Sequence, residues 1–472
     1  MTEKLSAEFH KDRVEALCRR CPDGLIVLRG ELDWSRKREI RALDPSYSES
    51  NFKQERHLYY LTGIEVPNSF VIIDPKTQEV LLYTDWTVER DLERVKSFGV
   101  VGEIRPPAAF LRDARDRGQA YDALYALYHP FPEAGRFAAY TGAQPGALAG
   151  VFPPGMGEPV GDDMQFTQKL SALFPAHRIK NLYPAVRDMQ RIKSLEEIRL
   201  LRKANEAVTA GVLEGIKSIR PGIHDRDVSA VIEYTMARRG ATRQVFAPNL
   251  MSGPNSVTML SELFSDYGHR DRELAAGDGI IIDIGTEVDY YLCSAVRTVP
   301  VAGRFTADQQ RIYELYLDCY RRTLEGIRPG VSQRELINIC AGAMEEALPS
   351  LQETYLRQTA EDFILLNTTA RSMLGHYVDL NVFGAGAQGD EPLEPGMIFI
   401  LEPMLFCREK QFGVVIGDTV LVTEEGCEIW SGDLPYDIAE IERIMAEPSI
   451  FEELEAETAR RNARVGTLPN AT

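Results

Sequence analysis

The chain has 472 residues, of which 44% are apolar and 26% charged, so it has the composition of a soluble globular protein and a length that favours two domains. Its formal net charge of −18 argues against nucleic acids and anionic membranes as partners, because both are polyanions that would repel an acidic chain. The sequence has no apolar run of the roughly 18 residues that a membrane span needs, and no apolar signal core in its first residues, so we expect a cytoplasmic protein.

The first part of the chain is expected to form a small mixed α/β domain. Residues 6 to 21 have the apolar spacing of an amphipathic helix, and residues 25 to 28 form a short apolar run that predicts a buried strand. Two further apolar runs, residues 70 to 73 and 80 to 84, flank a turn sequence that contains proline. These two runs predict a β-hairpin.

A long helix is predicted to open a second domain. Ser194 and Glu197 have the spacing of a capping box, in which the serine oxygen accepts a backbone N–H and the glutamate reaches back to the cap. Apolar residues then recur at helical spacing until Pro221 stops the helix. The same reasoning predicts two more helices, at residues 225 to 239 and at residues 307 to 327.

A hairpin with ionisable and aromatic side chains is predicted between these two helices. The apolar run of residues 279 to 282 leads directly to Asp283, which places this aspartate on a strand. A second strand is expected after a turn, and it carries Tyr290, Tyr291 and Arg297.

This hairpin resembles the first metal-ligand segment of the aminopeptidase P, prolidase and creatinase family, in which Asp-x-Gly is followed by a tyrosine, a second aspartate and an Arg-Thr pair. Residues 191 to 198 resemble the signature that opens the family's catalytic domain, and residues 51 to 63 resemble its N-domain segment. The resemblance implies an α/β (α+β) fold with an N-terminal domain at residues 1 to 185, a pita-bread domain at residues 186 to 446 and a tail at residues 447 to 472.

The resemblance also implies a site for two divalent metals, which would activate a bridging water and polarise the scissile carbonyl. Asp283, His376 and Glu402 match three of the five metal ligands, within segments that fit the family pattern. Ser294 and Gly417 stand where the family has the two carboxylates that bridge both metals, and neither residue can bridge. We therefore expect no dinuclear centre, and either one weakly held ion of Fe, Mn or Zn on the three remaining ligands or no metal.

Accessory side chains of the family are missing as well. The positions four residues before and seven residues after the ligand histidine are Ser372 and Phe383 instead of histidines. A third histidine position falls on Leu260 or Asp266, depending on the anchor of the alignment, and an arginine position falls on Val415. Proton transfer and leaving-group stabilisation therefore lack the groups that a peptidase of this family uses.

The remaining acids and the histidine define the predicted site. Asp283 and Glu402 are assigned as acid and base, with His376 as the proton carrier, because two carboxyl groups in different environments can acquire different pKa values. The predicted substrate contacts are Tyr290, Tyr291, Arg297 and Phe383. One of the two tyrosines is expected to face the core, and for Arg297 a pairing with a pocket carboxylate is favoured over contact with substrate. Cys293 is expected to be buried on the opposite face of its strand.

Three functions stay open at this point. The favoured one is a diverged aminopeptidase P-like enzyme that acts on a small amide or other C–N substrate with one metal ion or none. The alternatives are a non-catalytic pita-bread protein that serves as a binding module, and ordinary Xaa-Pro aminopeptidase activity. A small molecule or short peptide is the expected ligand, and a homodimer is the assembly that the resemblance implies.

Overall fold

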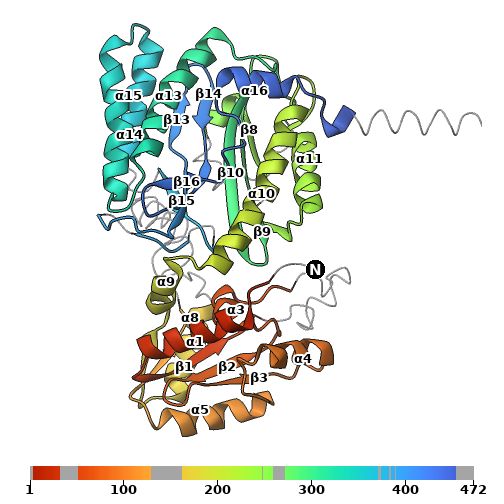
Figure 1. Cartoon of the computed structure of the whole chain (residues 1–472), viewed down its shortest axis with the longest axis vertical. Coiled ribbons are helices and arrows are strands. Elements are labelled where there is room, and N and C mark those ends of the chain that lie inside the picture. The colour runs from red at the N-terminus through yellow and green to blue at the C-terminus, as the bar shows by residue number, and fades with distance from the viewer. Residues whose placement is uncertain are drawn as a thin grey trace, which may run out of the picture. The chain divides into compact units, whose positions relative to one another are not determined.

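The computed structural model describes residues 4–31, 52–128, 162–246, 248–258, 272–369, 374–381, 384–387 and 390–452. The chain divides into two compact units between Arg191 and Ile192, and Figure 1 shows the helices and strands of each unit. The predictions for Ser372, Phe383, Leu260 and Asp266, and for the tail beyond residue 452, lie outside the described ranges.

The first unit is built on one sheet with the strand order β4-β3-β2-β1-β5-β6. Its strands are β1 (Gly24–Arg29), β2 (Phe70–Asp74), β3 (Glu79–Tyr83), β4 (Glu103–Arg105), β5 (Ala123–Ala126) and β6 (Arg178–Asn181). β2 pairs antiparallel with both β1 and β3, whereas the other neighbouring strands are parallel. The pair β2–β3 is the hairpin that the two apolar runs predict.

The first unit also contains helices, several of which contact the sheet. They are α1 (Ala7–Arg20), α3 (Arg56–Thr62), α4 (Glu89–Phe98), α5 (Phe110–Gly118), α8 (Asp162–Leu173) and α9 (Tyr183–Gln190), with a 3₁₀ turn at Pro107–Ala109. The side-chain oxygen of Ser6 caps α1 by accepting a hydrogen bond from the Phe9 N–H at 3.1 Å. Val14 and Leu17 are buried on the same face as Phe9, as the sequence predicts, and each such side chain contributes about 1.5–3 kcal/mol on burial.

The second unit contains three sheets. The strands of the first are β7 (Arg243–Gln244), β8 (Asn249–Ser252), β9 (Gly279–Val288) and β10 (Tyr291–Pro300), in the order β10-β9-β7 with β8 also paired to β9. The strands of the second follow the order β11-β12-β15-β16, with β11 (Gly375–Tyr377), β12 (Ile398–Leu401), β15 (Asp418–Val422) and β16 (Cys427–Ile429). β13 (Met404–Cys407) and β14 (Phe412–Val415) form the third.

Helices lie on both sides of these strands. They are α10 (Leu195–Ser218), α11 (Asp225–Arg238), α13 (Ala307–Gly326), α14 (Gln333–Ala347), α15 (Thr354–Thr369) and α16 (Ile438–Met445), with 3₁₀ turns at Gly253–Val257 and Leu348–Ser350. In Figure 1, α10 and α11 lie on one side of the strands, and α13, α14 and α15 lie on the other. Both bonds of the capping box predicted for Ser194 and Glu197 are present at the start of α10. The two helices predicted after α10 are confirmed as α11 and α13.

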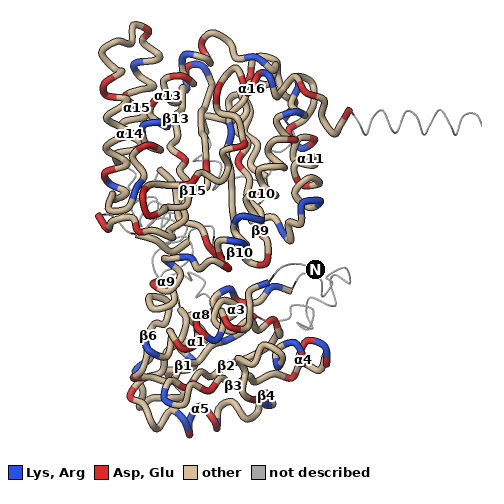
Figure 2. Tube along the Cα trace, in the orientation of Figure 1, with Lys and Arg blue, Asp and Glu red and all other residues tan. Residues whose placement is uncertain are grey.

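Helix α4 carries charged residues of both signs. Figure 2 shows basic and acidic residues side by side on α4, where Glu89, Arg90, Asp91 and Arg94 follow one another closely. Within the described ranges, none of the helices combines the length and apolarity that crossing a lipid bilayer requires.

Candidate active site

The β9–β10 hairpin positions Asp283. In its register Asp283 lies opposite Val296, and Ser294 lies opposite Gly285. Side chains two residues apart on one strand share a face, so Asp283, Val296 and Ser294 face the same side of the hairpin. Strand β8 pairs with the other edge of β9 and places Asn249 opposite Asp283. The Asn249 Nδ2 donates to Asp283 Oδ2 at 3.4 Å. The two ligand positions predicted on this hairpin are therefore neighbours, but only one of them carries an acid.

His376 and Glu402 come from the β11–β12 pair. His376 lies opposite Ile400, and alternation puts Glu402, two residues further, on the same face. His376 Nε2 lies 3.5 Å from Glu402 Oε1, and the two side chains are only 8% and 14% exposed. The Glu402 backbone N–H donates to Leu374 O at 2.8 Å. The structure thus brings together the histidine and the glutamate that the sequence assigns to one site.

The charge of Asp283 acts on Glu402, so the two carboxyl groups belong to one site. Burial raises the pKa of Asp283 to about 7, although the hydrogen bond from Asn249 acts in the opposite direction. Burial also raises the pKa of Glu402 well above its usual range, and the charge of Asp283 raises it further. Burial therefore favours the protonated form of both carboxyl groups, compared with exposed ones. We call Asp283, His376 and Glu402 the acid–histidine trio.

The raised pKa of Asp283 makes stability depend on pH. The folded state holds a proton on Asp283 up to about pH 7, whereas the unfolded chain releases it near pH 4, so the folded state loses stability as the pH rises through this window. Asp283→Asn removes this loss and is expected to raise the free energy of unfolding at pH 8 by up to about 4 kcal/mol. Urea unfolding with a metal chelator at pH 4 and pH 8 measures the difference. An equal effect at both pH values would contradict the prediction.

Gly417 lies against Val296, directly beside the trio's hairpin. The Val296 N–H donates to Gly417 O at 3.1 Å, and the Gly417 N–H donates to Val296 O at 2.9 Å. A Cβ atom at position 417 would lie 2.6 Å from Val296 Cγ2 and 2.9 Å from Val296 Cβ. A carboxylate side chain at this position therefore requires Val296 or its strand to move. Val296 in turn packs in an apolar cluster with Met251, Ile281, Met404 and Val415.

Arg297 is fully buried and faces away from the trio. It forms an ion pair with Asp418 at 2.6 Å, and both side chains are 0% exposed. Its guanidinium also donates to the carbonyl oxygens of Val296, Gly417, Ser431, Leu434 and Pro435. The carboxylate partner of Arg297 is therefore Asp418, which lies outside the trio, and not the pocket carboxylate that the sequence favours. The placement does not support the predicted substrate contact.

The other side chains predicted on the hairpin are also buried. Tyr291 is 0% exposed and its hydroxyl donates to Glu197 Oε1 at 3.1 Å, so it faces helix α10 and the core. Tyr290 is 6% exposed and stands in the turn, with a left-handed φ of 75°. Cys293 is buried, and its Sγ donates to Leu201 O at 3.1 Å, which confirms that it points away from Ser294. Its pKa is raised by burial, so it is an inert thiol.

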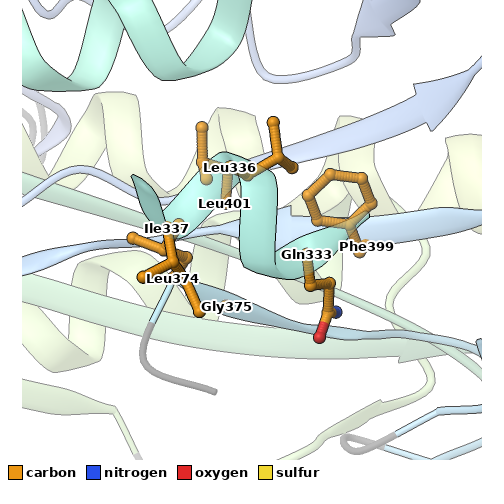
Figure 3. A pocket seen from close by; sticks show the side chains of 7 residues that line it. All are labelled: Gln333, Leu336, Ile337, Leu374, Gly375, Phe399 and Leu401. Atoms are coloured by element: carbon orange, nitrogen blue, oxygen red, sulfur yellow. The ribbon is translucent and has the colours of Figure 1, made fainter. Parts of the chain in front are cut away.

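An apolar pocket lies between helix α14 and the β11–β12 pair (Figure 3). Helix α14 contributes one wall and the β11–β12 pair the other. The lining residues are Gln333, Leu336, Ile337, Leu374, Gly375, Phe399 and Leu401. Because side chains alternate along a strand, Gly375 and Leu401 face this pocket while their neighbours His376 and Glu402 face the other way. This pocket is therefore separate from the trio.

Comparison with known proteins gives matches to both units. A sequence model described as "Metallopeptidase family M24" matches residues 199–424, and one described as "Aminopeptidase P, N-terminal domain" matches residues 10–96. The chain is 30% identical over 265 residues to the Xaa-Pro dipeptidase of Pyrococcus horikoshii, a match that covers 55% of this chain and 68% of that protein. The chain belongs to metallopeptidase family M24.

Other relatives extend the family M24 assignment. The chain is 26% identical over 468 residues to the Xaa-Pro aminopeptidase of Haemophilus influenzae, covering 93% of this chain and 97% of that protein. The match to the mitochondrial intermediate cleaving peptidase 55 of Arabidopsis thaliana, at 28% identity, spans 60% of this chain and only 56% of that protein. The structure of aminopeptidase P from Escherichia coli with the inhibitor Pro-Leu has a TM-score of 0.71 at 21% identity, covering 94% of this chain and 99% of that one. The predicted α/β fold, an aminopeptidase P-like N-terminal domain before a pita-bread domain, is confirmed.

Ser294 and Gly417 stand at the two positions that the family pattern assigns to carboxylates that bridge two metal ions. Ser294 offers a neutral hydroxyl, Gly417 offers no side chain, and Val296 takes the space that a side chain at position 417 would need. Within the described parts of the chain, no three His, Cys, Asp or Glu side chains are grouped so that they could hold a metal ion. The single ion predicted on the acid–histidine trio therefore has no support from this arrangement.

Two residues of the site have no signal in the sequence. Val296 belongs to an ordinary alternating strand, and its contact with Gly417 joins residues far apart in the chain. Asn249 lies before the hairpin in the chain, in a segment that matches no motif. Only the β8–β9 pairing brings it to Asp283.

Proposed function

We propose that this chain binds short peptides with proline in the second position and hydrolyses the Xaa-Pro bond by acid–base chemistry of the acid–histidine trio, without a two-metal centre. The observation that carries the proposal is the geometry of the trio. A buried histidine lies 3.5 Å from a glutamate that is 14% exposed, and a buried aspartate lies close enough to raise the pKa of that glutamate.

The substrate class comes from the names of the relatives. The proteins of H. influenzae and P. horikoshii are named for Xaa-Pro bonds, and the first match covers 93% of this chain. This favours Xaa-Pro peptides over the small amide or other C–N substrate that the sequence alone favours. The predicted homodimer and the predicted cytoplasmic location stay predictions.

The trio can supply the proton transfers of peptide hydrolysis. The ionised Asp283 accepts a proton from a water molecule whose oxygen attacks the scissile carbonyl carbon, and a tetrahedral intermediate forms. The protonated Glu402 then donates its proton to the proline nitrogen as the C–N bond breaks. His376, beside Glu402, carries the proton held by Asp283 back to Glu402, which restores the starting state. Two carboxyl groups with different pKa values can divide the roles of acid and base in this way.

Glu402→Gln tests this assignment, because glutamine keeps the shape of the side chain and cannot donate the proton. Removal of a general acid is expected to lower the kcat for a Xaa-Pro tripeptide by roughly 10²–10⁴-fold. Glu409→Gln makes the same chemical change on the exposed β13–β14 turn and is the matched control. Product release is measured by liquid chromatography in the presence of a chelator. Hydrolysis that survives in Glu402→Gln, or that disappears on chelation, would contradict the proposal.

A binding module without catalysis is the second candidate. It is favoured by position 417, where Val296 leaves no room for a side chain. A pocket that has lost both bridging carboxylates can still hold a peptide, because recognition and hydrolysis depend on different groups. Calorimetric titration with Pro-Leu and with a Xaa-Pro tripeptide separates the candidates. Binding without any release of product supports the module, and turnover supports the enzyme.

A further inference from the structure

Helix α13 carries three buried tyrosines. Tyr313, Tyr316 and Tyr320 are all 0% exposed, and the rings of Tyr316 and Tyr320 stack with their centroids 6.0 Å apart. The two outer hydroxyl groups have different surroundings. The Tyr320 hydroxyl donates to Asp418 at 2.5 Å, whereas the Tyr313 hydroxyl is buried without a hydrogen-bond partner in the described part of the chain.

The Tyr316 hydroxyl connects two backbone segments at the edge of the site. It donates to Pro403 O at 2.7 Å and accepts from the Ile416 N–H at 2.9 Å. Pro403 directly follows Glu402, and Ile416 directly precedes Gly417. One buried hydroxyl thus links the backbone just after Glu402 to the backbone just before Gly417.

This contact stands where the regular pairing of β12 and β15 ends. The last paired residues of β12 and β15 are Leu401 and Asp418, and the same two chain segments pair again as β13 and β14 from Met404 and Val415 onward. The backbone of Glu402 is fixed on its N-terminal side by the bond from its N–H to Leu374 O. On the C-terminal side of Glu402, the Tyr316 hydroxyl bridges Pro403 O and the Ile416 N–H, where the next hydrogen bond between the two strands would otherwise form.

We propose that Tyr316 is a positioning residue that keeps the Glu402 carboxyl within reach of His376 by fixing the backbone at Pro403. This inference rests on the proposed function, in which Glu402 is the proton donor. Without the hydroxyl, Pro403 O and Ile416 N lose a buried partner and the segment can shift. A misplacement of about 1 Å is enough to slow a reaction by roughly 10²-fold.

Tyr316→Phe and Tyr313→Phe form a matched pair. Each removes one buried hydroxyl from the same face of α13, but only the first removes hydrogen bonds. Tyr316→Phe is expected to lower the kcat for a Xaa-Pro tripeptide by roughly 10- to 100-fold while the KM changes less than about twofold, because binding is retained and the acid is displaced. Tyr313→Phe is expected to leave both constants unchanged.

A second readout works without turnover. The chain has seven histidines, and in protein labelled with ¹³C histidine the Hε1 signal of His376 is identified by its loss in His376→Gln. Tyr316→Phe is expected to move this signal, since the distance to Glu402 changes, and Tyr313→Phe is expected to leave it in place. An absence of hydrolysis in the wild type with a moved signal would reject the proposed function and keep the positioning role. Equal signals in both variants would overturn the positioning role.

Hydrogen exchange of the unmodified protein covers the case in which Tyr316→Phe does not fold. The Ile416 amide is expected to exchange as slowly as the Thr419 amide in the neighbouring strand, because both are buried and hydrogen-bonded. Exchange of the Ile416 amide at the rate of an exposed turn, such as Lys410, would overturn the proposal.

Discussion

Arg297→Met is expected to lower the free energy of unfolding by about 3–5 kcal/mol, or to prevent the second unit from folding, because it leaves a buried carboxylate without its counter-charge. Arg297 and Asp418 are both 0% exposed and lie 2.6 Å apart. The same guanidinium donates to Gly417 O at 3.0 Å, so its loss also frees the backbone at Gly417, beside the trio. Urea unfolding followed by far-UV circular dichroism measures the effect.

Two controls separate the ion pair from other causes. Arg297→Lys keeps the charge and loses the forked donors, so it is expected to be destabilised less than Arg297→Met. The double variant Arg297→Met with Asp418→Asn removes both charges. Its decrease in the free energy of unfolding is expected to be smaller than the sum of the decreases in the two single variants. If Arg297 were a substrate contact, Arg297→Met would keep its stability and only raise the KM. That outcome would contradict the structural role.

Gly417→Glu is expected to destabilise the protein by about 2–4 kcal/mol, because it adds side-chain atoms to a packed position and buries a carboxylate. The first of these atoms would lie 2.6 Å from Val296 Cγ2. Restoring the family's glutamate at this position alone is therefore expected to disturb the site and not to restore it.

Ser294→Asp is the matched control, since position 294 already carries a Cβ atom on the face of the trio. It introduces the other missing carboxylate and is expected to cost less stability than Gly417→Glu. Adding Val296→Ala to Gly417→Glu removes the valine methyl groups that occupy this space, and it is expected to recover part of the lost free energy of unfolding. A Gly417→Glu protein as stable as the wild type would show that Val296 does not close this position.

The fold could be predicted from the sequence because its signals are local. The capping box at Ser194 and Glu197 spans four residues, and the apolar run before Asp283 marks its strand directly. The hairpin register follows from a tight turn, in which Asp289 and Tyr290 adopt left-handed φ angles of 46° and 75°. Propensity and periodicity are sufficient for such elements, since the residues that decide them are neighbours in the chain.

The chemistry of the site could be predicted only in part. The trio was found by its place within segments that resemble a family, and the structure brings His376 and Glu402 together. The roles of Arg297 and Tyr291 were not accessible, because their partners Asp418 and Glu197 lie about a hundred residues away in the chain. Contacts of this kind depend on how sheets and helices pack, and no local pattern encodes them.

The number of metal ions held by the purified protein tests the central claim most directly. The protein is dialysed against Mn²⁺ or Zn²⁺, passed through a desalting column, and analysed by inductively coupled plasma mass spectrometry. Because Ser294 and Gly417 cannot bridge two ions and Val296 closes position 417, we predict at most about one equivalent per chain, and an equal or smaller value for Glu402→Gln. Two tightly held equivalents in the wild type, with loss of both in Glu402→Gln, would contradict the account.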